Sequence, residues 1–192
     1  MRWNIVNKFI KDRNYTSYLE IGVYNKTMYN RINCKDKECV DPDSKCDATY
    51  TMTSDTFFQK YPNKRYDIIF IDGLHHSDVV DRDIRNSLSV LNPNGVIVLH
   101  DCNPSTELHQ RVPRESGHWN GDVWKSLVRF IYNEHKNYNV YTVDIDEGIG
   151  IIDSGTCDCN FEMPEELTWD WLVSNRASCL NLIGFQEFLL DK

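Results

Sequence analysis

Residues 66–104 read YDIIFIDGLHHSDVVDRDIRNSLSVLNPNGVIVLHDCNP, and this stretch decides the fold. Two uninterrupted apolar runs, residues 68–71 and residues 96–99, end at Asp72 and at His100 respectively. Short runs of this kind are typical of strands buried on both faces of a parallel sheet. Between them apolar residues recur at helical spacing, and the turn residues 92–95 end that pattern. The stretch therefore predicts a strand, a helix and a second, parallel strand.

Polar side chains follow both predicted strands directly. A right-handed crossover brings the carboxyl ends of two such strands to the same edge of the sheet. We therefore expect five side chains to lie close together there: Asp72, His75, His76, His100 and Asp101. Each alone has a simpler explanation, since Asp often caps a helix and His often lies solvated in a loop. Two clusters at the edge where open α/β sheets bind ligands favour a functional site, with His76 in a structural role.

Composition narrows the class of protein. A chain of 192 residues that is 41% hydrophobic and 26% charged suits one globular domain. Its net charge of -8 argues against a nucleic acid or an anionic membrane as the main partner. No apolar run has the length of a membrane span, and the chain opens on an amphipathic segment where a secreted protein has a signal peptide. We expect a cytoplasmic protein, of a cell or of an infected host cell.

The seven cysteines are an odd number and lack the spacing of a disulfide framework. Free thiols in a reducing compartment are the favoured interpretation. A zinc site is the less favoured alternative, because none of the spacings is a CxxC. Its ligands would come from Cys34, Cys39, Cys46, Cys157 and Cys159.

The chain before this stretch shows the pattern of a cofactor-binding fold. Residues 1–14 predict an amphipathic N-terminal helix, and residues 17–23 predict a strand that delivers Glu20 and Gly22 into a turn. Many nucleotide-like cofactors are received at such a turn, where glycine lets the backbone approach the ligand. The next predicted strand ends at Asp41, which is either a ribose-binding carboxylate or a simple turn residue. Residues 53–55 predict a helix cap, with Asp55 also within reach of an adenine amino group.

The chain after this stretch begins with an irregular segment, residues 104–121. Long loops inside compact domains are often binding segments, so we expect this one to line the acceptor pocket. A helix over residues 123–131, with Asp122 as its favoured cap, and strands over residues 140–143 and 148–152 follow. The tail, residues 161–192, is helical by pattern.

Five segments, residues 18–23, 40–42, 53–55, 70–75 and 98–101, together resemble the class I S-adenosylmethionine-dependent methyltransferases. The resemblance is closest to the branch of small-molecule and sugar O-methyltransferases, several of which need a metal. It implies an α/β fold: a Rossmann-like, doubly wound, mostly parallel seven-stranded sheet with helices on both faces. It also implies S-adenosylmethionine as cofactor and a divalent ion, Mn²⁺ or Mg²⁺.

The resemblance assigns roles to individual positions. Glu20 and Gly22 match the motif beneath the methionine part of the cofactor, and Asp41 matches the residue that binds the ribose hydroxyls. Other positions are assigned as follows: Ser54 and Asp55 to adenine, Asp72 to the cofactor edge and the metal, Asp101 to the metal with His100 or Asn103 completing the shell, and His75 to the general base.

Two positions depart from the pattern of that branch. Tyr24 and Lys26 stand where the family's first loop often has glycines, which weakens the expectation of tight cofactor binding. His100 stands where the sugar enzymes have an acidic residue, and an imidazole ligand would favour Mn²⁺ over Mg²⁺.

The leading hypothesis is therefore methyl transfer to a hydroxyl of a sugar, a glycan or a similar polyol, with metal assistance and His75 as base. One alternative is a nicotinamide-dependent oxidoreductase, which the absence of Gly-x-Gly-x-x-Gly disfavours. Another is a catalytically silent binding module of a glycan-assembly complex, which the altered glycine loop would suit. The sequence leaves the acceptor and the oligomeric state open.

Overall fold

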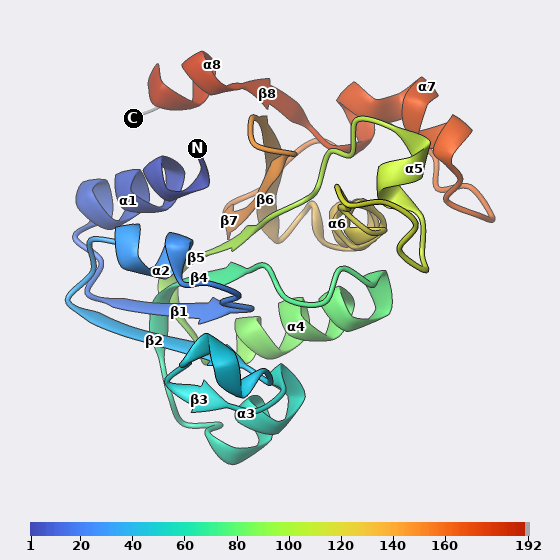
Figure 1. Ribbon diagram of the computed structural model, residues 1–192. Helices are drawn as coiled ribbons and strands as arrows, with labels where there is room; N and C mark the ends of the chain where they lie inside the picture. The colour runs from blue at the N-terminus through green and yellow to red at the C-terminus, as the bar shows by residue number, and fades with distance from the viewer. Residues whose placement is uncertain (191–192) are drawn as a thin grey trace. The chain divides into compact units, whose positions relative to one another are not determined.

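The computed structural model of the protein describes residues 1–190, and Figure 1 shows the course of the chain. These residues form two compact units. The first comprises Met1–Leu74 and Asp78–Leu99, and the second comprises His75–Ser77 and the chain from His100 onward. The expectation of one domain over residues 1–192 stays a prediction.

The first unit contains five parallel strands. They are β1 (Ser17–Ile21), β2 (Asp36–Asp41), β3 (Tyr50–Thr51), β4 (Tyr66–Ile71) and β5 (Leu91–Leu99), in the order β3-β2-β1-β4-β5. The chain adds strands outward from β1 to β3 and then returns to β4 on the other side of β1. The strand order therefore reverses between β1 and β4, which is where open α/β sheets bind their ligands.

Helices cover both faces of this sheet. The helices α1 (Arg2–Arg13) and α2 (Thr27–Arg31) lie on one side, and α3 (Ser54–Lys60) and most of α4 (Ser77–Val90) lie on the other (Figure 1). A short 3-10 helix, η1 (Ser44–Cys46), precedes β3. This arrangement confirms the predicted doubly wound α/β class.

The two apolar runs of the sequence form the centre of the core. Residues 68–70 of β4 and residues 96–99 of β5 are all 0% exposed, as expected of strands covered on both faces. The predicted amphipathic helix between them also forms, and it buries Val80, Ile84 and Val90. Burial of these side chains is the main source of stability, at about 1.5–3 kcal/mol for each fully buried aliphatic residue.

The second unit contains three strands and four helices among its described residues. In chain order these are α5 (Glu107–Gln110), α6 (Val123–Glu134), β6 (Tyr138–Asp144), β7 (Ile149–Ser154), α7 (Trp169–Cys179), β8 (Leu182–Gly184) and α8 (Phe185–Leu190). β6 pairs antiparallel with β7 and parallel with β8. The helix α6 packs on β6 and buries Trp124, Leu127 and Ile131 completely.

The structure differs from the sequence predictions in two places. Residues 1–190 hold eight strands where seven were expected, because β8 interrupts the tail that was predicted to be helical. Asn181, two residues after the end of α7, has a left-handed φ of 44°. The three residues of β8 that follow it are too few to show the alternating hydrophobic pattern of a strand. Residues 92–95, predicted as a turn, lie in the first half of β5.

All seven cysteines are free thiols. Over residues 1–190, no helix combines the length and the apolar character needed to cross a membrane.

Candidate active site: a cofactor cradle and a histidine–carboxylate cluster

Gly22 shapes the turn after β1 in the first unit. Its φ is +82°, and an added Cβ would lie 2.1 Å from the backbone oxygen of Asp72. Its N–H donates to the oxygen of Val40 at 2.9 Å, so the turn is held between β2 and β4. Only glycine combines this conformation with so close an approach. Further along, Tyr24 and Lys26 adopt left-handed φ values of 49° and 59° without being glycines.

Asp41 fixes the same turn from the end of β2. Its Oδ2 accepts hydrogen bonds from the backbone N–H of Val23 at 2.8 Å and of Tyr24 at 3.3 Å. Its Oδ1 accepts from the N–H of Asp43 at 2.8 Å. The carboxylate also forms a side-chain hydrogen bond with Cys46, so its contacts within the protein engage about four lone-pair sites. The contacts show Asp41 as a turn residue, and its ribose-binding role stays a prediction.

Glu20 lies beneath this turn and is 1% exposed. Burial raises the pKa of its carboxyl to about 8, and the hydrogen bond that it accepts from Tyr18 acts in the opposite direction. Buried carboxyls with a raised pKa are common at functional sites. Tyr18 and Glu20 are two residues apart in a strand, so their side chains lie on the same face of the sheet.

Thr53 is the residue that caps α3; its hydroxyl accepts from the N–H of Thr56 at 3.3 Å. Ser54, the first residue of that helix, hydrogen-bonds instead to the buried carboxyl of Asp83 on α4. Burial raises the pKa of Asp83 to about 6, and the hydrogen bond from Ser54 acts against it. Nothing in the sequence marks Asp83 as a buried residue, because a single acidic residue on a helix is ordinarily exposed.

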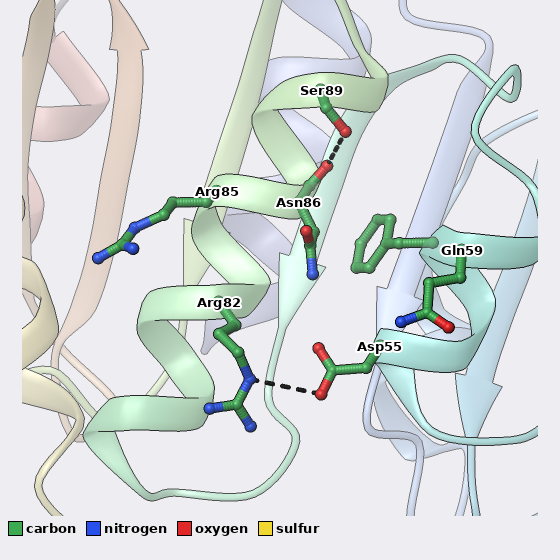
Figure 2. Close-up of a pocket in the computed structure, with 7 residues that line it drawn as sticks. Asp55, Gln59, Arg82, Arg85, Asn86 and Ser89 are labelled. Carbon is green, nitrogen blue, oxygen red and sulfur yellow. Dashed lines mark hydrogen bonds and ion pairs between the residues drawn. The ribbon is translucent and has the colours of Figure 1, made fainter.

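Asp55 opens onto a groove between α3 and α4, drawn in Figure 2. Its carboxylate points toward Arg82, with Oδ2 at 3.4 Å from Nε. The groove encloses about 330 Å³, and its other lining residues are Phe58, Gln59, Arg85, Asn86 and Ser89. The Asp55 carboxylate, which was predicted to contact adenine, thus forms an ion pair with Arg82. The contact of Asp55 with adenine stays a prediction.

Asp72 completes the first unit's part of the site. Its carboxylate lies 3.9 Å from the guanidinium of Arg2, at the start of α1. No sequence signal linked these two residues, since the contact depends on where α1 packs. Glu20, Gly22, Asp41, Ser54, Asp55 and Asp72 thus all belong to the first unit.

The second unit gathers the other predicted residues around Asp101. Its Oδ2 lies 3.0 Å from Nδ1 of His100 and 3.3 Å from Nδ1 of His75. Its Oδ1 accepts a 2.7 Å hydrogen bond from Nδ2 of Asn120, which is fully buried. Asp101 has a left-handed φ of 62°. Such strain in a residue other than glycine, held in place by its neighbours, is a frequent mark of a functional position.

His75 also contacts residues of the loop over residues 104–121. Its Nδ1 also lies 3.1 Å from the backbone oxygen of Trp119, and the Trp119 ring stacks on its imidazole with centroids 5.1 Å apart. Gly121 touches its backbone, because a Cβ there would lie 1.9 Å from the oxygen of His75. His76 meets only the edge of Trp119, at 5.9 Å between centroids. This difference suits the predicted structural role of His76.

Two side chains are placed differently from the predictions. Asp122 is the residue before α6, but its carboxylate does not cap that helix; it accepts from the N–H of Ser77 at 2.7 Å and from the Ser77 hydroxyl at 3.1 Å. The amide of Asn103 is engaged by Asp144, at 3.0 Å, and by Arg176. The role of Asn103 as a metal ligand therefore stays a prediction without a supporting contact.

Comparison with known proteins gives a consistent result. Residues 15–102 match a family model described as a methyltransferase domain. No curated protein matches this sequence significantly.

Three solved structures that share the fold are distant in sequence. An O-methyltransferase from Bacillus cereus in complex with SAH (S-adenosylhomocysteine) shares 12% identity, with a TM-score of 0.58 over 80% of each chain. A putative caffeoyl-CoA O-methyltransferase from Staphylococcus aureus shares 14% identity, with a TM-score of 0.58 over 80% of this chain and 83% of that one.

A third structure is the MycE methyltransferase of the mycinamycin biosynthetic pathway, in complex with Mg and SAH. It shares 16% identity with a TM-score of 0.51, over 88% of this chain and 52% of that one, so this protein spans about half of its length. Residues 15–102 thus match a methyltransferase domain, and the chain shares the fold of these O-methyltransferases.

Proposed function

We propose that the protein transfers a methyl group from S-adenosylmethionine to a hydroxyl oxygen of a sugar, a glycan or a similar small polyol, with His75 as general base. The observation that carries this proposal is the setting of the His75 ring. Its Nδ1 faces two acceptors, the Asp101 carboxylate at 3.3 Å and the Trp119 carbonyl at 3.1 Å. A neutral imidazole there carries its proton on Nδ1 and its lone pair on Nε2.

This tautomer is the one a general base requires. A hydroxyl is a poor nucleophile near neutral pH, and a base that accepts its proton contributes typically about 10²–10⁴-fold to the rate. Asp101 stabilises the imidazolium that forms, as a carboxylate does when it orients a catalytic histidine. Stacking on Trp119 fixes the ring plane and keeps water from one face. The cofactor supplies the electrophilic methyl of a sulfonium.

We include a divalent ion in the proposal. The resemblance assigns Asp72 and Asp101 to it, and within the second unit Nδ1 of His100 lies 3.0 Å from Oδ2 of Asp101. Mixed imidazole and carboxylate donors suit first-row ions such as Mn²⁺. A bound ion would lower the pKa of an acceptor hydroxyl.

The residues of the first unit also fit the cofactor. Gly22, with a φ of +82°, shapes the turn after β1, and Asp41 fixes that turn from the end of β2. The loop over residues 104–121 supplies Trp119, whose ring stacks on His75 and has the guanidinium of Arg114 5.7 Å from its centroid. The polyol acceptor rests on the resemblance to the sugar O-methyltransferases.

Isothermal titration of S-adenosylhomocysteine into the purified protein, in EDTA and then with Mn²⁺ or Mg²⁺, tests the cofactor. A panel of methyl-accepting sugars then tests the acceptor, with radiolabel transfer as the readout. Saturable cofactor binding and a metal-dependent labelled product are expected. Absence of cofactor binding under every condition would reject the proposal and favour the binding-module alternative.

A further inference from the structure

A second group of potential ligands lies in the second unit, outside the residues assigned above. It consists of His109 of α5, His118 of the following loop and Glu147 of the turn between β6 and β7. One ligand atom from each lies within 4.8 Å of the others. Nε2 of His118 is 3.2 Å from Oε2 of Glu147, and the two imidazole rings are 4.3 Å apart between centroids.

These donors match the chemistry of zinc. Two imidazoles and one carboxylate bind Zn²⁺ in sites that keep a fourth position for water, whereas Ca²⁺ and Mg²⁺ prefer all-oxygen ligands. Zinc-binding histidines usually use their second ring nitrogen in a hydrogen bond that fixes the ring. His109 has such a bond, because its Nδ1 lies 3.1 Å from the hydroxyl oxygen of Ser105. This contact leaves Nε2 of His109 as the ligand atom.

The backbone holds the ligands in place from two sides. The oxygen of His109 accepts hydrogen bonds from the N–H of Asn120 at 2.9 Å and of Gly121 at 3.1 Å, which folds the loop back onto α5. The oxygen of Glu147 accepts from the N–H of Asn103 at 2.8 Å. Glu147 itself has a left-handed φ of 65°. A strained residue held in this way has its side-chain direction fixed, as a preformed site requires.

The cluster is also connected to Asp101. The amide Nδ2 of Asn120 lies 3.4 Å from Oε2 of Glu147 and 2.7 Å from Oδ1 of Asp101. A change at Glu147 is therefore transmitted to Asp101 through one buried side chain.

We propose that His109, His118 and Glu147 bind Zn²⁺, and that this ion fastens the loop over residues 104–121 to the turn between β6 and β7. The ion is distinct from the one in the proposed function and does not depend on it. Its binding also fixes Asn120 and, through Asn120, the orientation of the Asp101 carboxylate.

Titration of Zn²⁺ alone into the full-length protein, after dialysis against EDTA, tests this site without any assay of methyl transfer. The key variant is His118→Ala, because that side chain is half exposed and its loss costs the fold little. Glu147→Gln keeps the shape of the side chain and removes its charge. His135→Ala is the matched control, since the His135 ring hydrogen-bonds to the backbone oxygens of Ile131 and Tyr132 in α6.

We expect the wild type and His135→Ala to bind one more Zn²⁺ per chain than His118→Ala binds. Loss of a residue that hydrogen-bonds to a metal ligand typically lowers metal affinity about 10–100-fold. Loss of a ligand itself should lower it at least as much, so Zn²⁺ affinity should fall at least about 100-fold in His118→Ala and Glu147→Gln. Amide exchange over residues 105–121 should slow on addition of Zn²⁺ in the wild type and in His135→Ala, and remain unchanged in His118→Ala.

Titration with Co²⁺ separates this site from a cysteine site. We expect ligand-field bands in the visible region without a thiolate charge-transfer band. Absence of Zn²⁺ binding, equal binding by His118→Ala, or a thiolate band would each overturn the proposal. Unchanged binding of S-adenosylhomocysteine by His118→Ala would show that any loss of Zn²⁺ is not a loss of the methyltransferase fold.

Discussion

The phenol of Tyr18 donates a 2.5 Å hydrogen bond to the carboxyl of Glu20, two residues further along β1 on the same face of the sheet. Both side chains are buried, at 0% and 1% exposure. Burial raises the pKa of Glu20 to about 8 and the pKa of Tyr18 well above its usual value. The pair therefore stays neutral and hydrogen-bonded in the folded protein over most of the physiological pH range.

This pair predicts how stability depends on pH. The pKa of Glu20 is about 8 in the folded protein and ordinarily 4.5, so between these values the folded state binds more protons than the unfolded state. Stability should consequently fall as the pH rises through this window, by an amount on the order of a few kcal/mol. Urea denaturation from pH 6 to pH 8 should show this fall in stability. The pKa of Asp83 is about 6, so Asp83 contributes to the pH dependence of stability mainly below this window.

Two variants isolate the contribution of Glu20. Glu20→Gln should remove most of the slope between pH 6 and pH 8. Tyr18→Phe should keep the slope and extend it to higher pH, because it removes the hydrogen bond that lowers the pKa of Glu20. An unchanged slope in Glu20→Gln would disprove this assignment.

Gly22→Ala should destabilise the first unit and weaken cofactor binding. The variant places a Cβ 2.1 Å from the oxygen of Asp72 in a residue with a φ of +82°. Left-handed backbone and overpacking together cost roughly 2–4 kcal/mol. Gly117→Ala is the control, since nothing lies within 4 Å of its Cβ and its φ is unstrained. That control should change stability by less than about 0.5 kcal/mol in the same urea titration, and equal effects of the two variants would contradict the prediction.

Asn120→Ala should destabilise the second unit by about 1–3 kcal/mol, because it leaves the buried carboxylate of Asp101 with one donor fewer. Thermal and urea unfolding would measure the loss. Asn137→Ala is the comparison, since the amide of Asn137 bonds to Glu134 on the exposed surface. Stability losses of the same size in the two variants would mean that Asn120 is not a support of Asp101.

His75→Ala should lower kcat by about 10²–10⁴-fold and leave the affinity for S-adenosylhomocysteine nearly unchanged. The reason is that the predicted cofactor residues belong to the first unit and His75 to the second. Steady-state kinetics with the best acceptor and calorimetry with the cofactor product measure the two quantities. His76→Ala should retain most of the activity. An unaltered kcat in His75→Ala would remove this residue from the mechanism.

The sequence could predict the elements whose burial follows a pattern. The runs at residues 68–71 and 96–99 were recognisable as strands because both faces of each are covered, which excludes polar residues throughout. The sequence also placed Glu20, Gly22, Asp41 and Asp72 at the carboxyl ends of β1, β2 and β4, the edge at which open α/β sheets bind ligands.

Other features depend on contacts that no local pattern encodes. The three residues of β8 are strand only because β6 offers a free edge to pair with. Asp122 has the position of a cap for α6, yet its carboxylate bonds to Ser77, 45 residues earlier. Asn120 carries no sign of its burial, since asparagine in a loop is ordinarily solvated. In each case a tertiary neighbour decided the structure against the local preference.

The bond between Asp122 and Ser77 also bears on synthesis of the chain. Ser77 is the first residue of α4, and its N–H reaches a partner that the ribosome adds 45 residues later. At about 5–20 residues per second, α4 therefore waits several seconds for the group that satisfies its first turn. Late in that delay the five strands of the first unit are already synthesised, but the first N–H group of α4 has no partner. A chaperone that binds the nascent chain would act in this period.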